Sequence, residues 1–560
     1  MIGWTNARCV VIFFWLLAAV LGGFHAWASR YSMNPDGIVY LDMADAYLGR
    51  DWGTALISYR SPLYPWILGL AMALFKPPPL WEFPVVHLVN YLLYLFALAC
   101  FHFLLRQIVR RRNERCHRLP QWSLLTIGYS LFIWCSLTLI GLELVTPDVA
   151  VAGLVFLLTG ILLRIQSGSQ GWRLFALLGA VSAVGYLTKA IFLPLGIVFI
   201  LLSLALVGRA KAVVPRLVVS LVAFAVLASP YVIALSVTKR HLTLGDSGKF
   251  AYLFMVNERP LIHWRGDPPE SGTPTHPSRA VLSDPSLYEF DGPVGGTYPM
   301  WYDLSYWNEG MRIQIAPTRH LFLFMRFAWR CLISLVNEQA VILVSAIVLH
   351  CLSQGQWWRN IANEWILLVP AAAGLTFYAL TWPEWRYLGA FVVLVWLAVF
   401  LAASAPESHQ LLQPGATVST ILAGTLMLQM VTSVPGLVTE RSSNEEYGHL
   451  LTVLPALGVS PGSKVGFIGS SFSAYWAHLA RVRIVAEIPD VRWDPGLRRA
   501  ERPTAADRFW QMEPSARAAA MGAFVRIGIK AVLACGNRGQ VGDSGWQRIH
   551  GTSCLIYLPH

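Results

Sequence analysis

An Asn-Pro-Asp sequence near the start of the chain opens the stretch best suited to acid–base chemistry. In NPDGIVYLDMADAYLGRDW (34–52), Pro35 and Asp36 can begin a helix whose apolar face carries Ile38, Leu41, Ala44 and Leu48. Asp36 falls in the first turn, where free N–H groups and the helix dipole favour a carboxylate. Asp36 is therefore either a helix-capping residue or a candidate general base.

Further polar side chains follow on the same predicted helix. Tyr40 lies one turn after Asp36, and Asp42 and Asp45 share a face at i, i+3 spacing. These two acids are either solvated or part of a site. We expect the helix to lie flat on the membrane surface.

A second short helix is predicted just downstream. YRSPLYPWILGLAMALF (59–75) is apolar but too short to span a membrane, so Pro62 and Pro65 should mark the start of a re-entrant or surface-bound helix. Arg60 precedes it and can contact either lipid headgroups or a bound phosphate. Tyr64 is a further candidate.

Two more ionisable positions interrupt apolar stretches. In ELVTPDVAVAGL (143–154), Glu143 and Asp148 stand at the end of a predicted span, where Asp148 belongs either to a helix start or to a site. Lys189 interrupts an apolar hairpin in GYLTKAIFLPLG (185–196). A lone lysine there either snorkels to the interface or holds a phosphate as a point charge.

A last cluster lies in WPEWRYLGAF (382–391), at the mouth of another predicted span. Glu384 and Arg386 form either a simple ion pair or, through Arg386, a clamp on a phosphate, with Tyr387 beside them.

The composition identifies the setting of these residues. Of 560 residues, 55% are hydrophobic and 13% are charged, and the mean hydropathy is +0.51. Soluble domains carry roughly 25% charged residues. The chain is therefore predicted to be a polytopic membrane protein, which excludes an ordinary cytosolic enzyme, a disordered chain and a disulfide scaffold.

The hydropathy pattern predicts about eleven transmembrane helices. They fall near residues 10–29, 84–106, 120–140, 145–165, 173–187, 190–208, 216–237, 331–353, 363–382, 385–404 and 415–434. The first is interpreted as a signal anchor rather than a cleaved signal peptide.

The basic residues predict the orientation. With the N-terminus in the cytoplasm, inner loops collect Arg106, Arg110, Arg111, Arg112, Arg115, Arg118, Arg164, Arg173, Arg209, Lys211 and Arg216. This positive-inside pattern accounts for much of the net charge of +12 without a nucleic-acid partner.

Three segments are then extracytoplasmic. Residues 30–83 form a first outer loop with interfacial helices, 239–330 form a long outer loop, and 436–560 form a soluble tail, so residues 1–435 make up the transmembrane domain. The tail predicts a small α/β domain. Its buried strands should lie at 464–471, 482–488 and 530–536, its helix at 503–527 and its closing strand or hairpin at 546–558. Cys535 and Cys554 are either a disulfide or two buried thiols.

Familiar catalytic motifs are absent from the sequence. There is no HExxH, no phosphate-binding P-loop and no zinc-type Cys/His cluster. GSSFS (469–473) lacks the final glycine of a nucleophile elbow.

The order and spacing of these pieces resemble the integral-membrane GT-C glycosyltransferases, and most closely the bacterial aminoarabinose (lipid A) transferases and protein O-mannosyltransferase relatives. The matching pieces, in chain order, are Pro35-Asp36, Tyr40, Arg50-Asp51-Trp52, Pro62 to Phe75, Asp148, Thr188-Lys189 and Arg386-Tyr387. The resemblance covers roughly residues 8–240, and 380–400 more weakly. Gly37 and Arg60-Ser61 depart from the family pattern.

The resemblance implies inverting sugar transfer from a polyprenyl-phosphate donor to a hydroxyl of a lipid, glycan or protein, at the outer face of a bacterial-type inner membrane. Asp36 would be the base, Tyr40 and Asp148 would orient acceptor or base, and Lys189, Arg60 and Arg386 would bind the donor phosphate. The resemblance implies no cofactor apart from a divalent cation. The departures at Gly37 and at Arg60-Ser61 leave open whether that cation is required.

Two other functions fit the same acids and cations: a transporter or flippase of lipid-linked sugars, and a non-catalytic envelope assembly protein. Transporters of that kind usually show internal repeats and sites at mid-membrane. No repeat is visible here, and the ionisable residues lie near the predicted span ends, so we favour the transferase.

Overall fold

The computed structural model describes residues 2–112, 119–207, 210–259, 272–352, 357–403, 412–438, 442–490, 504–536 and 545–559. They divide into two compact units. The helical unit contains Met1–Ser29, His87–Ile233 and Pro317–Val438, and the mixed unit contains Arg30–Val86, Ala234–Ala316 and Thr439–His560.

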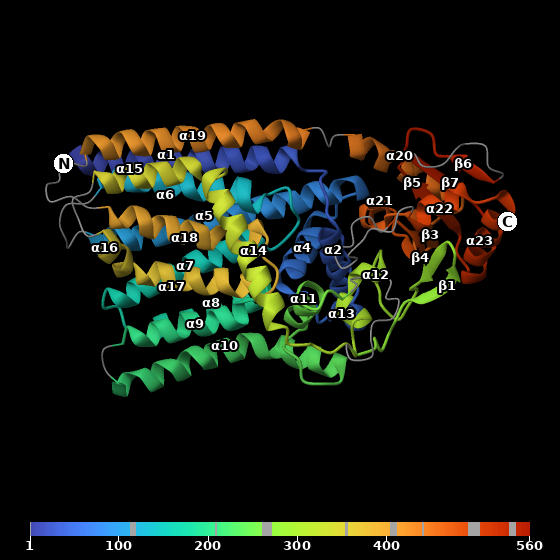
Figure 1. Ribbon diagram of the computed structural model, residues 1–560, viewed down its shortest axis with the longest axis horizontal. Helices are drawn as coiled ribbons and strands as arrows, with labels where there is room; N and C mark the ends of the chain where they lie inside the picture. Colours follow the sequence, from blue (N-terminus) through green and yellow to red (C-terminus); the bar gives the residue numbers. More distant parts are fainter. Residues whose placement is uncertain are drawn as a thin grey trace. The chain divides into compact units, whose positions relative to one another are not determined.

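The helical unit is built mainly from apolar helices, most of which run alongside one another (Figure 1). They are α1 (Ile2–Ala28), most of α5 (Pro79–Arg112), α6 (Gln121–Trp134) with a π-helical extension (Cys135–Ile140), α7 (Asp148–Gln166), α8 (Trp172–Thr188), α9 (Phe192–Ala205), most of α10 (Ala210–Lys239), α14 (Pro317–Val336), α15 (Ala340–Cys351), α16 (Trp357–Asn363), α17 (Trp365–Ala379), α18 (Trp385–Ala402) and α19 (Leu412–Val438).

Several of these helices are long and apolar enough to cross a membrane. Within the described residues, six helices qualify singly and two bent pairs qualify together, while α4, α8 and α9 are shorter apolar helices. Each of the eleven predicted spans falls on one or more of the helices above. The number of crossings and the predicted orientation stay predictions.

One predicted span differs from the structure. Residues 331–353 do not form a single helix, because α14 and α15 meet at a bend of 75°. Gln339 at the bend is buried and is hydrogen-bonded to Ser334 and to the indole of Trp396. These polar contacts stabilise the break. α14 also starts inside the predicted long loop. Its three arginines lower the mean hydropathy of this amphipathic helix, so the hydropathy pattern did not show its first half.

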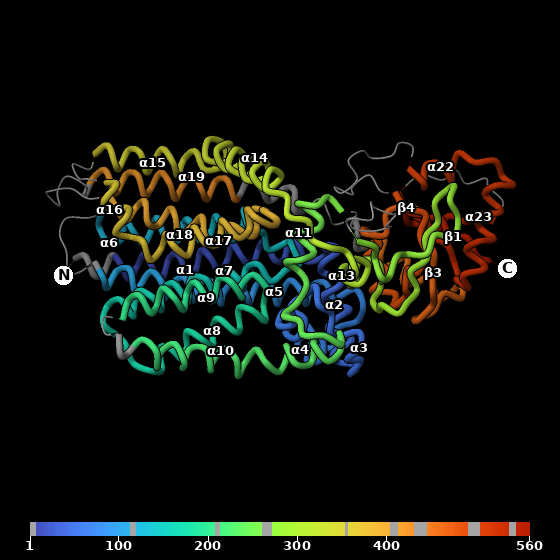
Figure 2. The backbone as a smooth tube through the Cα atoms, turned by 60° about the horizontal axis from the view of Figure 1, so that its bottom comes forward, coloured from blue at the N-terminus to red at the C-terminus, as the bar shows by residue number. Residues whose placement is uncertain are grey.

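The mixed unit contains a seven-stranded sheet in the order β1-β2-β4-β3-β5-β7-β6. The strands are β1 (Arg279–Ser283), β2 (Ser286–Glu289), β3 (Lys464–Gly469), β4 (Arg483–Pro489), β5 (Ala531–Cys535), β6 (Trp546–Arg548) and β7 (Cys554–Tyr557). The central strands β4, β3 and β5 are parallel, and the outer pairs are antiparallel. Figure 2 shows the sheet strands gathered with α22 and α23.

Its helices are mostly short. They are α2 (Pro35–Leu48), α3 (Trp52–Ala55), α4 (Leu63–Phe75), α11 (Ser247–Met255), α12 (Pro299–Tyr302), α13 (Leu304–Trp307), α20 (Ser442–Ala456), α21 (Trp476–Leu479), α22 (Ala505–Gln511) and α23 (Pro514–Ile527), with a 3₁₀ turn at Ser471–Ser473.

The three predicted buried strands and the closing hairpin of the tail are confirmed as β3, β4, β5 and β6–β7. The single helix predicted for 503–527 is wrong, because the described residues there form α22 and α23, with Pro514 starting the second helix. Proline has no backbone N–H and suits a first turn, so the chain restarts there.

The sequence did not predict β1 and β2. They come from the predicted long loop, and β2 pairs antiparallel with β4 of the tail. Strands this short form because a partner edge is present. The domain division at residues 435 and 436 stays a prediction.

The two tail cysteines are bonded. Cys535 and Cys554 face each other across β5 and β7 and form a disulfide. Of the two alternatives open from the sequence, the structure has the disulfide.

Two helical hairpins close tightly over glycines. A Cβ on Gly185 of α8 would lie 2.3 Å from the Phe192 ring of α9, and one on Gly374 of α17 would lie 2.2 Å from the Phe391 ring of α18. These hairpins carry Lys189 and Arg386, so the glycines help to place both cations.

We therefore predict that Gly374→Ala destabilises the chain by about 1–3 kcal/mol, as overpacking does in other cores. The matched control is Gly424→Ala at an exposed position of α19, where a Cβ would meet nothing within 4 Å. Thermal melts in detergent should show a lower Tm for Gly374→Ala alone. Equal melting of the two variants would contradict the tight approach.

Candidate functional site

Asp36 occupies the second position of α2, directly after Pro35. The predicted helix start is confirmed, and Asp36 lies in the first turn of α2, where the helix dipole favours a carboxylate. Ile38, Leu41 and Ala44 are buried, and α2 packs on α4 in the mixed unit. This packing fixes the helix that presents Asp36, whose side chain remains 28% exposed.

Arg60 is the partner of Asp36. Its Nη2 lies 2.6 Å from Asp36 Oδ1, and its side chain is only 4% exposed. Nη1 donates to the backbone oxygens of Tyr302 at 3.2 Å and Trp301 at 3.5 Å. The fork-shaped guanidinium therefore ties α2 to α12, and it orients the aspartate.

Aromatic rings surround this ion pair. The Arg60 guanidinium lies 4.7 Å from the Tyr59 ring centre and 5.9 Å from that of Tyr40. Tyr40 meets Tyr64 edge to face at 5.1 Å. Burial by itself lowers the pKa of Arg60, but the Asp36 carboxylate outweighs it and holds that pKa above its usual value.

The second cluster lies in the helical unit, around Asp148 at the start of α7. Asp148 is 2% exposed, and its two oxygens meet Lys189 Nζ at 2.5 Å and the Thr146 hydroxyl at 2.9 Å. Burial lowers the pKa of Lys189, and Asp148 opposes that shift. The lysine stays 24% exposed, so a ligand can reach it.

Arg386 completes this cluster. Its Nε lies 2.7 Å from Glu384 Oε2 and 3.8 Å from Asp148 Oδ2, and its Nη2 donates to the Tyr387 hydroxyl. Lys189 Nζ sits 3.5 Å from the Tyr387 ring centre, and Tyr378 stacks on that ring. Two cations, two acids and two stacked tyrosines thus come together from α7, α17, α18 and the α8–α9 turn.

The predicted residues therefore fall into separate groups. Asp36, Arg60, Tyr40 and Tyr64 belong to the mixed unit, whereas the Asp148 cluster belongs to the helical unit. Glu143 packs against Gly141, where an added Cβ would lie 2.4 Å from its Oε1.

Asp42 and Asp45 belong to a third group. From the sequence, both acids could have been solvated, but Asp42 is buried. Its side chain is 8% exposed, and Oδ1 lies 2.8 Å from His478 Nδ1. Thr297 donates to Asp42 through both its backbone N–H and its hydroxyl, each at 2.7 Å. Asp45 pairs with Arg481 at 2.6 Å.

Glu82 at the start of α5 closes the group. His478 Nε2 lies 3.1 Å from Glu82 Oε2, and Arg481 Nη2 lies 2.5 Å from Glu82 Oε1. An imidazole with a carboxylate at each nitrogen can donate to both only when it is protonated. Burial by itself lowers the pKa of His478, but the hydrogen bonds and charges of Asp42 and Glu82 raise it to about 9.

Sequence reasoning missed several of these partners. His478, Arg481 and Glu82 lie far from α2 in the chain, and the carbonyls of Trp301 and Tyr302 carry no side-chain signal. Glu82 alone offered a hint, as an acid inside an otherwise apolar helix start. Among the described residues, no three His, Cys, Asp or Glu side chains are arranged to hold a metal ion.

Comparison with known proteins identifies the fold. No family model matches the chain, and no curated protein matches it. Two solved structures of ArnT from Cupriavidus metallidurans match it over nearly their whole length. The apo structure matches with a TM-score of 0.55 and 10% identity over 98% of both chains.

The second, bound to undecaprenyl phosphate, matches with a TM-score of 0.56 and 11% identity over 98% of this chain and 97% of that one. The chain has the GT-C fold. The predicted fold class, a helical membrane body with a small α/β part, is thereby confirmed.

In this GT-C fold, the His478 group yields a pH prediction. In the folded protein the pKa of His478 is about 9, whereas its ordinary value is 6.5. Protonated His478 therefore makes its full contribution to the stability of the fold below pH 6.5, and that contribution is lost as the pH rises through 9. The loss is on the order of 3 kcal/mol, from about 1.4 kcal/mol per pKa unit.

Melting the wild type between pH 6 and pH 10 should therefore show a falling Tm, and His478→Gln should flatten that slope. His550→Gln, at an exposed position of the same unit, is the control and should keep the wild-type slope. A wild-type slope in His478→Gln would refute the assignment of the titrating group.

Proposed function

We propose that this chain transfers a sugar from a polyprenyl-phosphate donor to an acceptor hydroxyl. The observation that carries the proposal is the Asp36–Arg60 pair, in which a partly exposed carboxylate is held at a helix start by a buried guanidinium. The GT-C fold supports the reaction class, and one of the matched ArnT structures is bound to undecaprenyl phosphate.

The chemistry follows from the residue types. Asp36 takes the proton of the acceptor hydroxyl while that oxygen attacks the anomeric carbon. The bond between the anomeric carbon and the phosphate oxygen breaks in the same displacement, and the phosphate leaves as an anion. A single displacement of this kind inverts the anomeric centre.

Arg60 serves this step chiefly by orienting Asp36. From the sequence we expected it to bind the donor phosphate, but its guanidinium is almost closed to solvent and is hydrogen-bonded to Asp36 and to two carbonyls. Tyr40, whose ring lies beside the guanidinium, lines the same place.

We assign the donor phosphate to Lys189 and Arg386. Preorganised cations stabilise charge that develops on a leaving group. Asp148 binds both cations and sets their spacing, while Tyr387 and Tyr378 hold the lysine from one side. We expect the reaction to take place at the extracytoplasmic face of the membrane.

The base is tested with Asp36→Asn, which keeps the shape of the side chain but cannot take a proton. Transfer of radiolabelled sugar from a polyprenyl-phosphate donor in detergent should fall at least about 100-fold, the usual size of a general-base contribution. Asp284→Asn, whose side chain is 74% exposed, should retain wild-type activity. Full transfer by Asp36→Asn would overturn the proposal. Because detergent removes the two sides of the membrane, a flippase would form no product in this assay.

The phosphate site is tested with Lys189→Met/Asp148→Asn, because removing the lysine alone would leave a buried charge unpaired at a cost of about 3–5 kcal/mol. We expect binding of undecaprenyl phosphate, followed by native mass spectrometry, to weaken about tenfold or more, the size expected for one charge-assisted hydrogen bond. Arg173→Ala, an exposed cation of the same unit, should bind normally. Unchanged binding by the double variant would remove Lys189 from the site.

A further inference from the structure

Helix α14 of the helical unit carries a row of arginines. Arg319, Arg326 and Arg330 are separated by seven and four residues, so they follow one face of a helix with 3.6 residues per turn. From Arg319 to Arg330 the row is about 16 Å long, at 1.5 Å per residue. The helix contains no aspartate or glutamate, so the row is a line of positive charge.

Two of these arginines are open to the surroundings. Arg326 and Arg330 are both exposed. Among the residues that the structure describes, no carboxylate forms an ion pair with either of them. Their charges are therefore available to an anion from outside the chain.

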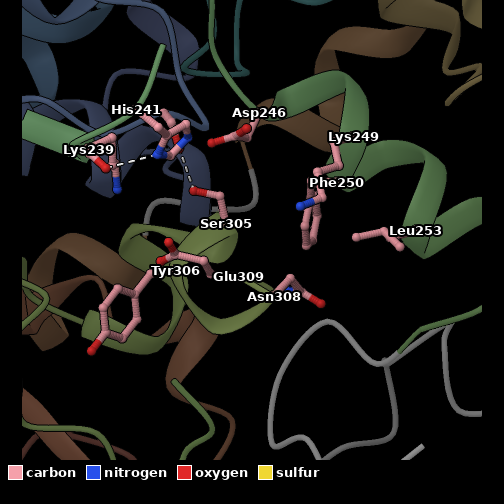
Figure 3. A pocket seen from close by; sticks show the side chains of 11 residues that line it. Lys239, His241, Asp246, Lys249, Phe250, Leu253, Ser305, Tyr306, Asn308 and Glu309 are labelled. Carbon is pink, nitrogen blue, oxygen red and sulfur yellow. Dashed lines mark hydrogen bonds between the residues drawn. The ribbon is translucent and has the colours of Figure 1, made fainter. Parts of the chain in front are cut away.

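The charged cavity between α11 and α13 of the mixed unit differs in this respect (Figure 3). Its lining contains two lysines, Lys239 and Lys249, and two carboxylates, Asp246 and Glu309. Such a lining favours neither an anion nor a cation. The unbalanced charge thus belongs to α14.

An apolar face lies beside the arginine row. Phe322, Met325 and Trp329 follow one another at i, i+3 and i+4 spacing, and they are 49%, 57% and 62% exposed. On the other side of the row, Phe327 and Ser334 are buried against the helical unit. α14 therefore uses one face for packing, a second for positive charge and a third for exposed apolar side chains.

The direction of α14 suits this division. It meets α15 at a bend of 75°, and Figure 1 shows it running across the direction of α15, α17 and α18. Because α15 runs alongside the other apolar helices, α14 lies close to the membrane plane. An amphipathic helix in that plane buries its apolar face at the acyl-chain boundary and keeps its cations among the headgroups.

We propose that α14 is an interfacial helix that binds anionic phospholipids of the surrounding leaflet. Their phosphates contact Arg326 and Arg330, and their acyl chains cover Phe322, Met325 and Trp329. The length of the row favours a leaflet over one compact anion, since a single phosphate cannot contact both ends. The proposal is independent of the transferase function.

The test is photo-cross-linking of the full chain in phosphatidylcholine nanodiscs. Two probes, phosphatidylglycerol and phosphatidylcholine, carry the same photoreactive acyl chain, and peptide mass mapping measures the label on residues 317–336. The anionic probe should label α14 about tenfold or more above the other, since each basic residue near an anionic lipid surface contributes roughly fivefold in affinity.

Arg326→Gln/Arg330→Gln should lower this preference at least about fivefold. Arg326→Lys/Arg330→Lys keeps both charges and should retain the preference. Arg526→Gln/Arg548→Gln removes the same charge from exposed positions of the mixed unit and should leave the labelling of α14 unchanged.

Three results would overturn the proposal: equal labelling of α14 by the two probes, an unchanged preference in Arg326→Gln/Arg330→Gln, or no label on α14. One equivalent of undecaprenyl phosphate serves as a competitor, because it also carries a phosphate. Loss of the label at that ratio would assign the arginines to the donor and would also refute the leaflet as their partner. None of these results depends on sugar transfer, so Asp36→Asn should be labelled as the wild type is.

Discussion

A charge that is closed off from water must be matched inside the protein, and this requirement shapes each of the charged clusters described above. Arg60 illustrates it best, since its guanidinium cannot lose its proton and its side chain is 4% exposed. Asp36 and two backbone carbonyls match that charge. One side chain, in the segment just before α4, therefore links α2 to α12.

The same requirement links segments that are far apart in the chain. One group joins the start of α7 at Asp148, the end of α8 at Lys189 and the start of α18 at Arg386. Another joins α21 to α2 and α5 through His478. Removing one member of such a group leaves another charge buried and unmatched, which costs more than the pair itself contributes. A single substitution therefore changes the structure as well as the proposed role, so conservative or paired substitutions are needed to separate the two.

The His478 group also gives the C-terminal segment a physical role. Through His478 and Arg481, the short stretch after β3 binds two acids of α2, the helix that presents Asp36. The sheet also recruits β1 and β2 from the segment that leads on to α12, whose carbonyls hold Arg60. The segments around the candidate base are thus fixed by residues from four parts of the chain.

The sequence by itself determined the apolar helices, the strands β3, β4 and β5, and the starts of α2 and α4, because these depend on local periodicity, proline and hydropathy. It also singled out Asp36, Arg60, Asp148, Lys189 and Arg386, since charges are conspicuous in so apolar a chain. Only the tertiary structure decided their partners, the bend between α14 and α15, the β1–β2 edge and the burial of Asp42 by His478. Those features depend on contacts between residues far apart in the chain, which no local pattern encodes.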